Sequence, residues 1–312
     1  MKKNVFLILF SLLPVLGFAQ GNCHLVDEIC QKARQFANSG DTETALKGLR
    51  RAQNDNELRS CPGFYKIANL IEEIEGKKKS GSIVKKTYTV NGVSFNMVQV
   101  DGGTFTMGGT AEQEKPYNNE KPTHQVTLSS YLIGETEVTQ ELWQAVMGSN
   151  PSEFPGNKRP VEKVSWYDCQ EFIKKLNQQT GARFRLPTEA EWEFAARGGN
   201  RSNHTQYAGS RDIGAVAWYG DNSGSSTHDV ATKKPNELGL YDMSGNVWEW
   251  CNDWYGSFSS TSQTNPKGPS SGSNRMLRGG SWYFNAWYCR VSNRGNYGPS
   301  NRYGDYGLRL AL

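Results

Sequence analysis

One short stretch of the chain carries the residue types that a hard metal ion requires. Asp242 and Glu249 supply carboxylates, and the main-chain carbonyls of Gly245 and Val247 lie between them in the sequence. Calcium prefers about six to eight oxygen ligands at roughly 2.3–2.6 Å. We therefore predict a structural calcium ion at Asp242, Gly245, Val247 and Glu249, which would stiffen loops that are costly in entropy to order. The alternative is that the carboxylates only cap the turn between them.

The N-terminus has the pattern of a secretory signal peptide over residues 1–19. Lys2 and Lys3 precede a mostly apolar run, and the small residue Ala19 precedes the expected cleavage site. The run is shorter than the ~20 residues that a membrane-spanning helix needs, and no later segment of the sequence reaches that length. We expect export to the periplasm, the cell surface or the medium, with no transmembrane segment after cleavage.

The cysteines and histidines offer little further metal chemistry. The 4 histidines are scattered and no Cys-x-x-Cys spacing occurs, so a zinc site is not expected. Disulfides are common in exported proteins. Each half of the chain has an odd number of the 6 cysteines, so each half keeps a free thiol or the halves are cross-linked. The pairing stays open among Cys23, Cys30, Cys61, Cys169, Cys251 and Cys289.

The overall composition argues against two classes of protein. A net charge of +4 over 312 residues is unlike a nucleic-acid-binding protein, which carries a dense basic patch. It is also unlike a disordered chain, which combines low hydrophobicity with high net charge. The 33 glycines and 12% aromatic residues predict a globular protein with many turns and irregular loops.

The region after the predicted signal peptide is expected to be helical. Residues 22–76 carry apolar side chains at helical spacing, interrupted at Gly40 and Asp41. This pattern predicts a small module that resembles a single tetratricopeptide hairpin, acting as a cap or a docking unit. Residues 77–86 are rich in Lys, Gly and Ser and predict a linker.

Residues 87–312 predict one α+β domain with much irregular structure. Asn91-Gly92 between two alternating segments indicates a β-hairpin. Capping signals at Thr139, Ser165 and Thr188 predict the starts of short helices. From residue 199 onward, glycines and aromatic residues alternate without a long period, which indicates short strands and loops.

Motifs in this region occur in an order that identifies a family. They are the stretches 102–108, 160–166, 185–193, 239–250 and 278–282. Together they resemble the formylglycine-generating enzyme (sulfatase-modifying factor) family over residues 93–312. The resemblance implies a C-type-lectin-like fold, and it matches the predicted calcium ligands to the family's calcium loop residue by residue. A second family calcium site would fall within residues 215–229, where this chain has a short loop, so we do not expect it.

The resemblance also implies a catalytic site that this chain does not complete. Family enzymes oxidise a sulfatase cysteine with O2 and a copper(I) ion held between two cysteines, after a Gly-Gly-Ser motif that ends here at Ser281. The corresponding positions are Phe284 and Cys289. Copper(I) prefers thiolate ligands, and a phenyl ring cannot bind it. We therefore expect no copper and no catalytic residues at Ser281, Phe284 or Cys289.

The C-terminal segment is similar to that of the variable proteins of diversity-generating retroelements. Positions that resemble fixed anchors (289–290, 293–294, 301–302 and 307–310) alternate with aromatic, Asn and Gly residues. Such residues are typical of binding loops. In those variable proteins, adenines in asparagine codons are randomised, and a tryptophan codon cannot arise in this way. Trp287 therefore does not fit such an origin, and an ordinary member of the family remains an alternative. The predicted ligand-binding residues are Tyr283, Phe284, Asn285, Trp287, Tyr288, Gly295, Asn296, Tyr297, Gly298, Tyr303, Gly304 and Asp305.

These observations favour an exported, non-catalytic protein that binds a protein, peptide or glycan through its C-terminal loops, and no nucleic acid. One alternative is a formylglycine-generating oxidase that uses Cys289 with an unfamiliar partner. The second is a structural or secretion-assembly component of the cell envelope.

Overall fold

The computed structural model describes residues 24–55, 58–61, 63–78 and 83–312. The predicted signal peptide and Cys23 lie outside these residues. The chain divides into two compact units, residues 1–82 and 83–312, which are described separately here. None of the helices in the described part of the chain is long and apolar enough to cross a membrane.

The first unit is helical, as its periodicity predicts. Its helices are α2 (His24–Asn38), α3 (Thr42–Gln53), the short 3-10 helix η1 (Leu58–Ser60) and α4 (Tyr65–Lys78). The apolar faces of the α-helices form one buried cluster that includes Ala33, Leu49 and Ile67. The side chain of Asp41 caps α3 by accepting a hydrogen bond from the backbone N–H of Thr44.

The strands of the second unit are short and form small sheets. Their bounds are β1 (Lys85–Val90), β2 (Val93–Val100), β3 (Gly103–Met107), β4 (His124–Leu128), β5 (Tyr131–Gly134), β6 (Trp248–Trp254), β7 (Gln263–Thr264), β8 (Arg275–Arg278), β9 (Gly295–Tyr297) and β10 (Tyr306–Leu308). They pair in the orders β1-β2-β5, β10-β6-β8-β9 and β3-β4-β7. The predicted hairpin is β1-β2, and its first strand begins at Lys85, within the segment predicted as linker.

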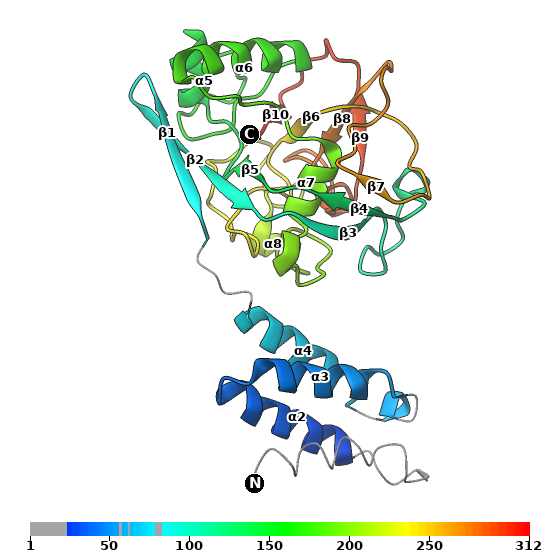
Figure 1. The fold of residues 1–312 in the computed structure, drawn as a ribbon. Coiled ribbons are helices and arrows are strands. Elements are labelled where there is room, and N and C mark those ends of the chain that lie inside the picture. The colour runs from blue at the N-terminus through cyan, green and yellow to red at the C-terminus, as the bar shows by residue number, and fades with distance from the viewer. Residues whose placement is uncertain (1–23, 56–57, 62, 79–82) are drawn as a thin grey trace. The chain divides into compact units, whose positions relative to one another are not determined.

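Local sequence signals begin and end the helices of this unit. They are α5 (Gln140–Met147), α6 (Trp166–Thr180), α7 (Glu189–Ala196), α8 (Ile213–Val216), and the 3-10 helices η2 (Asn118–Glu120), η3 (Gly199–Arg201) and η4 (Ala286–Cys289). Thr139, Ser165 and Thr188 are the N-caps of α5, α6 and α7, as predicted. Figure 1 shows α5 and α6 together at one end of the unit. Helix α7 contacts β3 and β4 of one sheet and β6 and β8 of another.

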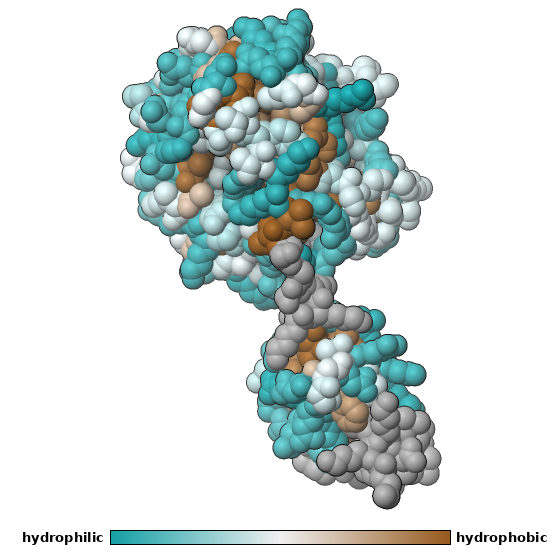
Figure 2. All heavy atoms as spheres, turned by 60° about the vertical axis from the view of Figure 1, so that its left-hand side comes forward, coloured by the Kyte–Doolittle hydropathy of each residue, from teal (hydrophilic) through white to brown (hydrophobic). Residues whose placement is uncertain are grey.

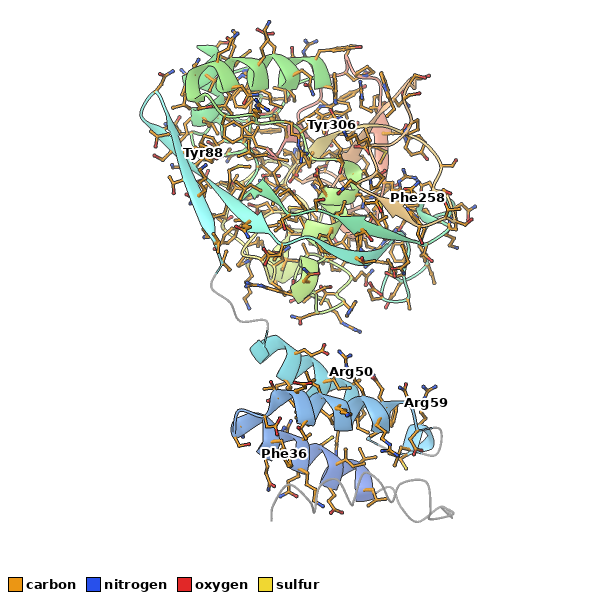
Figure 3. All side chains as sticks on the ribbon, viewed as in Figure 1. Phe36, Arg50, Arg59, Tyr88, Phe258 and Tyr306 are labelled. Carbon is orange, nitrogen blue, oxygen red and sulfur yellow. The ribbon has the colours of Figure 1, made fainter. Side chains whose placement is uncertain are left out.

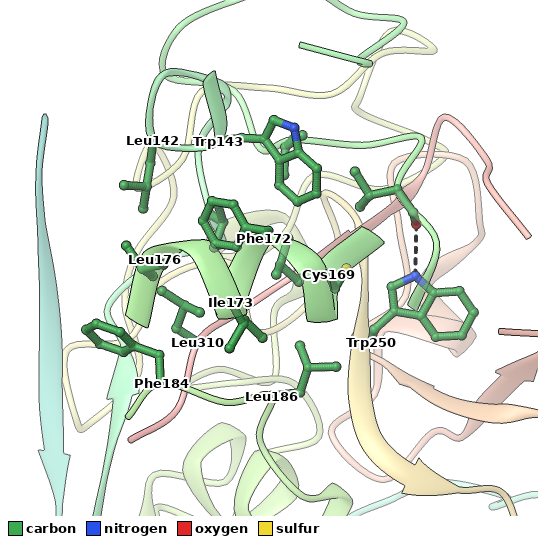
Figure 4. Close-up of a cluster of buried hydrophobic side chains, with 14 of the residues drawn as sticks. Leu142, Trp143, Cys169, Phe172, Ile173, Leu176, Phe184, Leu186, Trp250 and Leu310 are labelled. Atoms are coloured by element: carbon green, nitrogen blue, oxygen red, sulfur yellow. Dashed lines mark hydrogen bonds between the residues drawn. The ribbon is translucent and has the colours of Figure 1, made fainter. Parts of the chain in front are cut away.

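Large aromatic side chains fill the core of the second unit. In the cluster of Figure 4, the rings of Trp143 and Phe172 stack with centroids 4.8 Å apart. Trp250 is fully buried and donates a hydrogen bond from Nε1 to the carbonyl of Val164 (3.0 Å). Trp248 is also buried. Trp248 and Trp250 of β6 therefore point inward together, as their spacing of two residues in a strand requires.

Candidate binding surface

The C-terminal segment separates into buried and solvent-accessible positions. Every residue predicted to bind ligand keeps some exposure, and none of them is buried. The exposed ones are Asn285 and the tyrosines Tyr283 (68%), Tyr297 (42%) and Tyr303 (42%). The anchor residues at 289–290, 293–294 and 307–310, which alternate with these positions along the chain, are all buried. The predicted anchors therefore face the core at these positions, and the aromatic, Asn and Gly positions reach the surface.

The pair at 301–302 departs from this pattern. Asn301 is half-buried and Arg302 is exposed. Arg302 forms an ion pair with Asp168 at the start of α6 (2.6 Å). This residue is therefore held at the surface rather than in the core.

Buried arginines hold the segment in place. Arg290 makes two hydrogen bonds to the carboxylate of Glu120 in η2 (2.6 and 2.8 Å), and both side chains are fully buried. Arg294 binds Glu189 in the same two-bonded way (2.6 and 2.8 Å). Such charge-assisted pairs fix geometry, and they compensate charges that would otherwise be very costly to bury.

Aromatic rings from the segment pack side by side. The ring of Phe284 lies 4.9 Å from that of Tyr288, 5.5 Å from that of Tyr283 and 5.9 Å from that of Trp248. The ring of Tyr117, which is 42% exposed, lies 6.2 Å from that of Tyr288. A second group joins Tyr297 to Tyr303 (5.4 Å) and Tyr303 to the buried Tyr306 of β10 (5.0 Å). We call Tyr117, Tyr283, Phe284, Tyr288, Tyr297 and Tyr303 the aromatic surface.

Trp287 stands beside this surface. Trp287 and Tyr288 are both half-buried, so each ring keeps part of its surface exposed to solvent. The guanidinium of Arg290 lies over the indole of Trp287 at 4.8 Å, and the arginine donates a hydrogen bond to its carbonyl. This cation–π contact holds the tryptophan in one orientation.

Cys289 lies beneath this surface as an isolated thiol. It is fully buried, and burial raises its pKa to about 12, so the sulfur is protonated at neutral pH. The thiolate is the form that binds metals and attacks substrates. Its apolar neighbours are Tyr207 and Val216, and their cluster contains no other cysteine. Together with Phe284, this environment does not fit a copper(I) ion.

The cysteines of the second unit do not pair. Cys169, Cys251 and Cys289 are all free, as is Cys30 of the first unit. Cys251 packs in a different core cluster, which includes Trp192. Among the pairings left open by the sequence, a disulfide between Cys251 and Cys289 does not form, because each sulfur is enclosed by its own apolar surroundings.

Ser281 takes part in a polar contact at the edge of the surface. It is buried and donates a hydrogen bond from its hydroxyl to Asp305 (2.9 Å). Burial raises the pKa of the Asp305 carboxyl to about 6. The family position that precedes the copper site therefore serves here to support the loop that carries Tyr303 and Asp305.

The predicted calcium ligands lie in a buried acidic cluster. Both oxygens of Glu249 are engaged by Arg309 (2.7–3.0 Å), and one also accepts from Trp192 Nε1 (2.6 Å). Asp242 accepts a hydrogen bond from the backbone N–H of Ala231 at Oδ2, whereas its buried Oδ1 has no partner. In the part of the chain that the structure describes, no group of at least three acidic, histidine or cysteine side chains is arranged to hold a metal.

Some residues of these sites carry no motif in the sequence. Glu137 is buried beside the predicted calcium ligands and accepts hydrogen bonds from Asn246 Nδ2 (2.6 Å) and the backbone N–H of Val247 (3.1 Å). Burial and the charges of Asp242 and Glu249 raise its pKa well above the usual range. Tyr117 and Glu120 reach the C-terminal segment from a loop more than a hundred residues earlier. Only the fold brings them there.

Comparisons with known proteins agree with this architecture. Residues 86–312 match the model of the sulfatase-modifying factor enzyme 1-like domain. The chaperone protein LppX of Paenibacillus barcinonensis is 35% identical over 268 residues, which cover 70% of this chain and 89% of the relative. A formylglycine-generating enzyme of Streptomyces coelicolor is 29% identical over 282 residues, with 69% and 88% covered.

A solved structure is similar over the same region. Variable protein 1 of Treponema denticola superposes with a TM-score of 0.67 at 41% identity, covering 73% of this chain and 99% of that chain. These similarities confirm the resemblance of the domain and of its C-terminal segment, and the predicted α+β fold with a preceding helical region.

Proposed function

Since the chain belongs to the family of the sulfatase-modifying factor enzyme 1-like domain, we propose that it is a non-catalytic member that binds a protein, peptide or glycan through the aromatic surface. The observation that carries this proposal is the separation within the C-terminal segment. Buried arginine–glutamate pairs hold its backbone, and exposed tyrosines stand on it. Rigid aromatic side chains on an ordered backbone lose little entropy on binding.

Two relatives bear on the kind of ligand. LppX is named a chaperone protein, a class that acts on polypeptides, which supports a protein or peptide. The similarity to a variable protein supports a surface whose residues differ between copies while the scaffold stays the same. We propose that the segment is such a surface, whether or not its gene is diversified.

A binding experiment tests this function directly. The full chain would be screened against a phage-displayed random peptide library and a glycan array. Binders should lose about tenfold in affinity with Tyr283→Ala or Tyr303→Ala, as expected for exposed aromatic contacts. Tyr65→Ala in α4 is the matched control, because this tyrosine is 64% exposed in the other unit. Equal effects of all three substitutions, or no binder, would contradict the proposal.

A second experiment separates binding from oxidation. Copper(I) affinity and conversion of a Cys-x-Pro-x-Arg peptide to formylglycine would be measured for the wild type and for Phe284→Cys. We expect no copper-dependent turnover by the wild type, because Cys289 is a buried thiol and the position of the family's other copper-binding cysteine is Phe284. The variant restores the second sulfur and should gain copper(I) binding. Copper-dependent turnover by the wild type would show that the chain is an oxidase.

We further propose that the protein is exported, and that it carries a structural calcium ion at the predicted loop. Glu137, Asp242 and Glu249 are buried close to one another, and Arg309 compensates only part of their charge. Asp242, whose Oδ1 lacks a partner, would hold the ion together with the carbonyls of Gly245 and Val247, and Glu249 would contribute while paired with Arg309. Such an ion would stabilise the loop that precedes β6.

Fractionation of expressing cells tests whether the protein is exported.

A further inference from the structure

A cavity of about 540 Å3 lies beside the sheet β3-β4-β7. None of the residues predicted above for ligand or metal binding lines it. Its inner wall is made of buried side chains, among them Met107, His124 and Asp253, and its rim is part of the segment 256–269. Figure 3 shows Phe258, one of its lining residues, next to β7. The volume falls within the range of small-molecule sites.

The rim is fastened to the rest of the unit. Within it, β7 pairs with β4, and Asn265 accepts a hydrogen bond from the backbone N–H of Ser129 (2.9 Å). Gly268 has a φ of +70°, and a Cβ at this position would come within 2.9 Å of the Cβ of Asp253. Only glycine fits this close approach without strain. The cavity is therefore preformed.

His124 presents an unused hydrogen-bond acceptor. The side chain is 5% exposed and lines the cavity. Its Nδ1 contacts the carbonyl oxygen of Pro122 at 3.3 Å. A carbonyl only accepts hydrogen bonds, so Nδ1 carries the proton and Nε2 is left as an acceptor. The only hydrogen bond of this ring to a described residue is the one at Nδ1, so Nε2 is free to accept a hydrogen bond from a ligand in the cavity.

Asp253 presents the complementary group. It is 3% exposed, and its Oδ2 accepts a hydrogen bond from the backbone N–H of Glu189 (3.0 Å). Burial, and then the negative charge of Glu189, raise its pKa to about 8. At neutral pH most of this carboxyl is protonated and can donate a hydrogen bond.

The buried charged side chains that line the cavity compensate each other. Glu189 is compensated by Arg294 through two hydrogen bonds (2.6 and 2.8 Å), and the guanidinium also donates to the carbonyls of Asn119 and Gly256. Lys267 is on the rim but exposed. Apolar surface is supplied by Trp254 and Phe258.

We infer that this cavity binds a small neutral polyhydroxylated ligand of the mono- or disaccharide class. A sugar hydroxyl both donates and accepts hydrogen bonds, so it can satisfy His124 Nε2 and Asp253 together. The C–H face of the sugar ring would contact the aromatic side chains and Met107. An anion would meet the carboxylate of Glu189, and an ammonium group would meet the guanidinium of Arg294.

Saturation-transfer NMR and calorimetry on the full chain test this inference. The neutral probes are glucose, galactose, N-acetylglucosamine and maltose at about 10 mM, where even weak binding is visible. At least one of them should bind. His124→Phe keeps an aromatic ring against Phe258 but removes the acceptor, and should weaken binding about tenfold, the effect of one lost hydrogen bond. Gln263→Ala, at the rim, is a second variant if His124→Phe melts early.

Gln125→Ala is the matched control, because Gln125 neighbours His124 but is exposed and does not line the cavity. It should bind like the wild type. The inference is overturned if no neutral sugar binds, if only glucosamine or glucose 6-phosphate binds, or if a folded His124→Phe binds as well as the wild type. The test is independent of the aromatic surface, so it can fail while the proposed function stands.

Discussion

Asp305 links the ionisation of one side chain to the stability of the loop that carries Tyr303. Its pKa is about 6 in the folded chain, against 3.8 as the ordinary value. Between these values the folded chain holds a proton that the unfolded chain has released. The free energy of unfolding therefore falls as the pH rises from about 4 to about 6, and this part of the stability is fully lost above that range.

We predict that Asp305→Asn removes this fall. From pH 4 to pH 7, the variant should gain on the order of 2 kcal/mol in unfolding free energy relative to the wild type. Urea unfolding at several pH values measures the difference. Asp229→Asn, at an exposed aspartate, should run parallel to the wild type. If Asp305→Asn also runs parallel, the carboxyl does not titrate as described.

At the residue scale, the sequence predicts positions whose neighbours lie close along the chain. Phe284 and Cys289 could be placed because the Gly-Gly-Ser motif fixes their spacing. The alternation of anchors and exposed residues could be read in the same way. Tyr117 could not, because its contact with Tyr288 depends on a loop 170 residues away, tied down by the pair of Glu120 and Arg290. Nothing in the letters around Tyr117 signals that pairing.

The elements of the C-terminal segment depend on buried ion pairs for their position. We predict that Arg290→Met, which leaves Glu120 buried without its partner, costs about 3–5 kcal/mol in unfolding free energy. Chemical denaturation measures this loss. Adding Glu120→Gln removes the uncompensated charge and should recover part of it.

Arg302→Met is the matched control for this prediction. Arg302 is paired with Asp168 at the surface, and exposed pairs contribute less than about 1 kcal/mol. A similar cost for Arg290→Met and Arg302→Met would show that the buried pair does not position the segment.

The loop before β6 is the element that calcium would stabilise. We predict that calcium raises the Tm of the wild type relative to EDTA, since a ligand at about 100 times its Kd adds roughly 2.7 kcal/mol. Asp242→Asn removes the carboxylate with the free oxygen and should abolish the difference, whereas Asp229→Asn should keep it. Equal Tm values in calcium and EDTA for the wild type would contradict the site.

Helices and sheets differ in how far the sequence determines them. The starts of α5, α6 and α7 are set by side chains that bond to N–H groups three residues later, so local reading succeeds. The sheets join distant strands, as β4 does with β7 and β6 with β10. Such pairings have no local signature, so the residues along either strand do not predict them.

At the scale of the whole molecule, the second unit has its own core. Its two large clusters of buried residues are formed by side chains from residues 90–310. The similarity to variable protein 1 covers 99% of that solved chain but 73% of this one. The solved chain therefore has the shared fold without the remaining part of this chain. The surface of the second unit that faces the viewer in Figure 2 is mostly hydrophilic, with hydrophobic residues in small separate areas.

We predict that residues 83–312 fold without the helical unit. The isolated fragment should unfold cooperatively, with a Tm close to that of the corresponding transition in the full chain, because its apolar clusters remain complete. Circular dichroism and calorimetry of both proteins measure this. Peptides or glycans that bind the full chain through Tyr283 and Tyr303 should bind the fragment with the same affinity, since every residue of the aromatic surface lies within it. If the fragment folds but loses this binding, the helical unit is part of the binding site, and the function belongs to both units together.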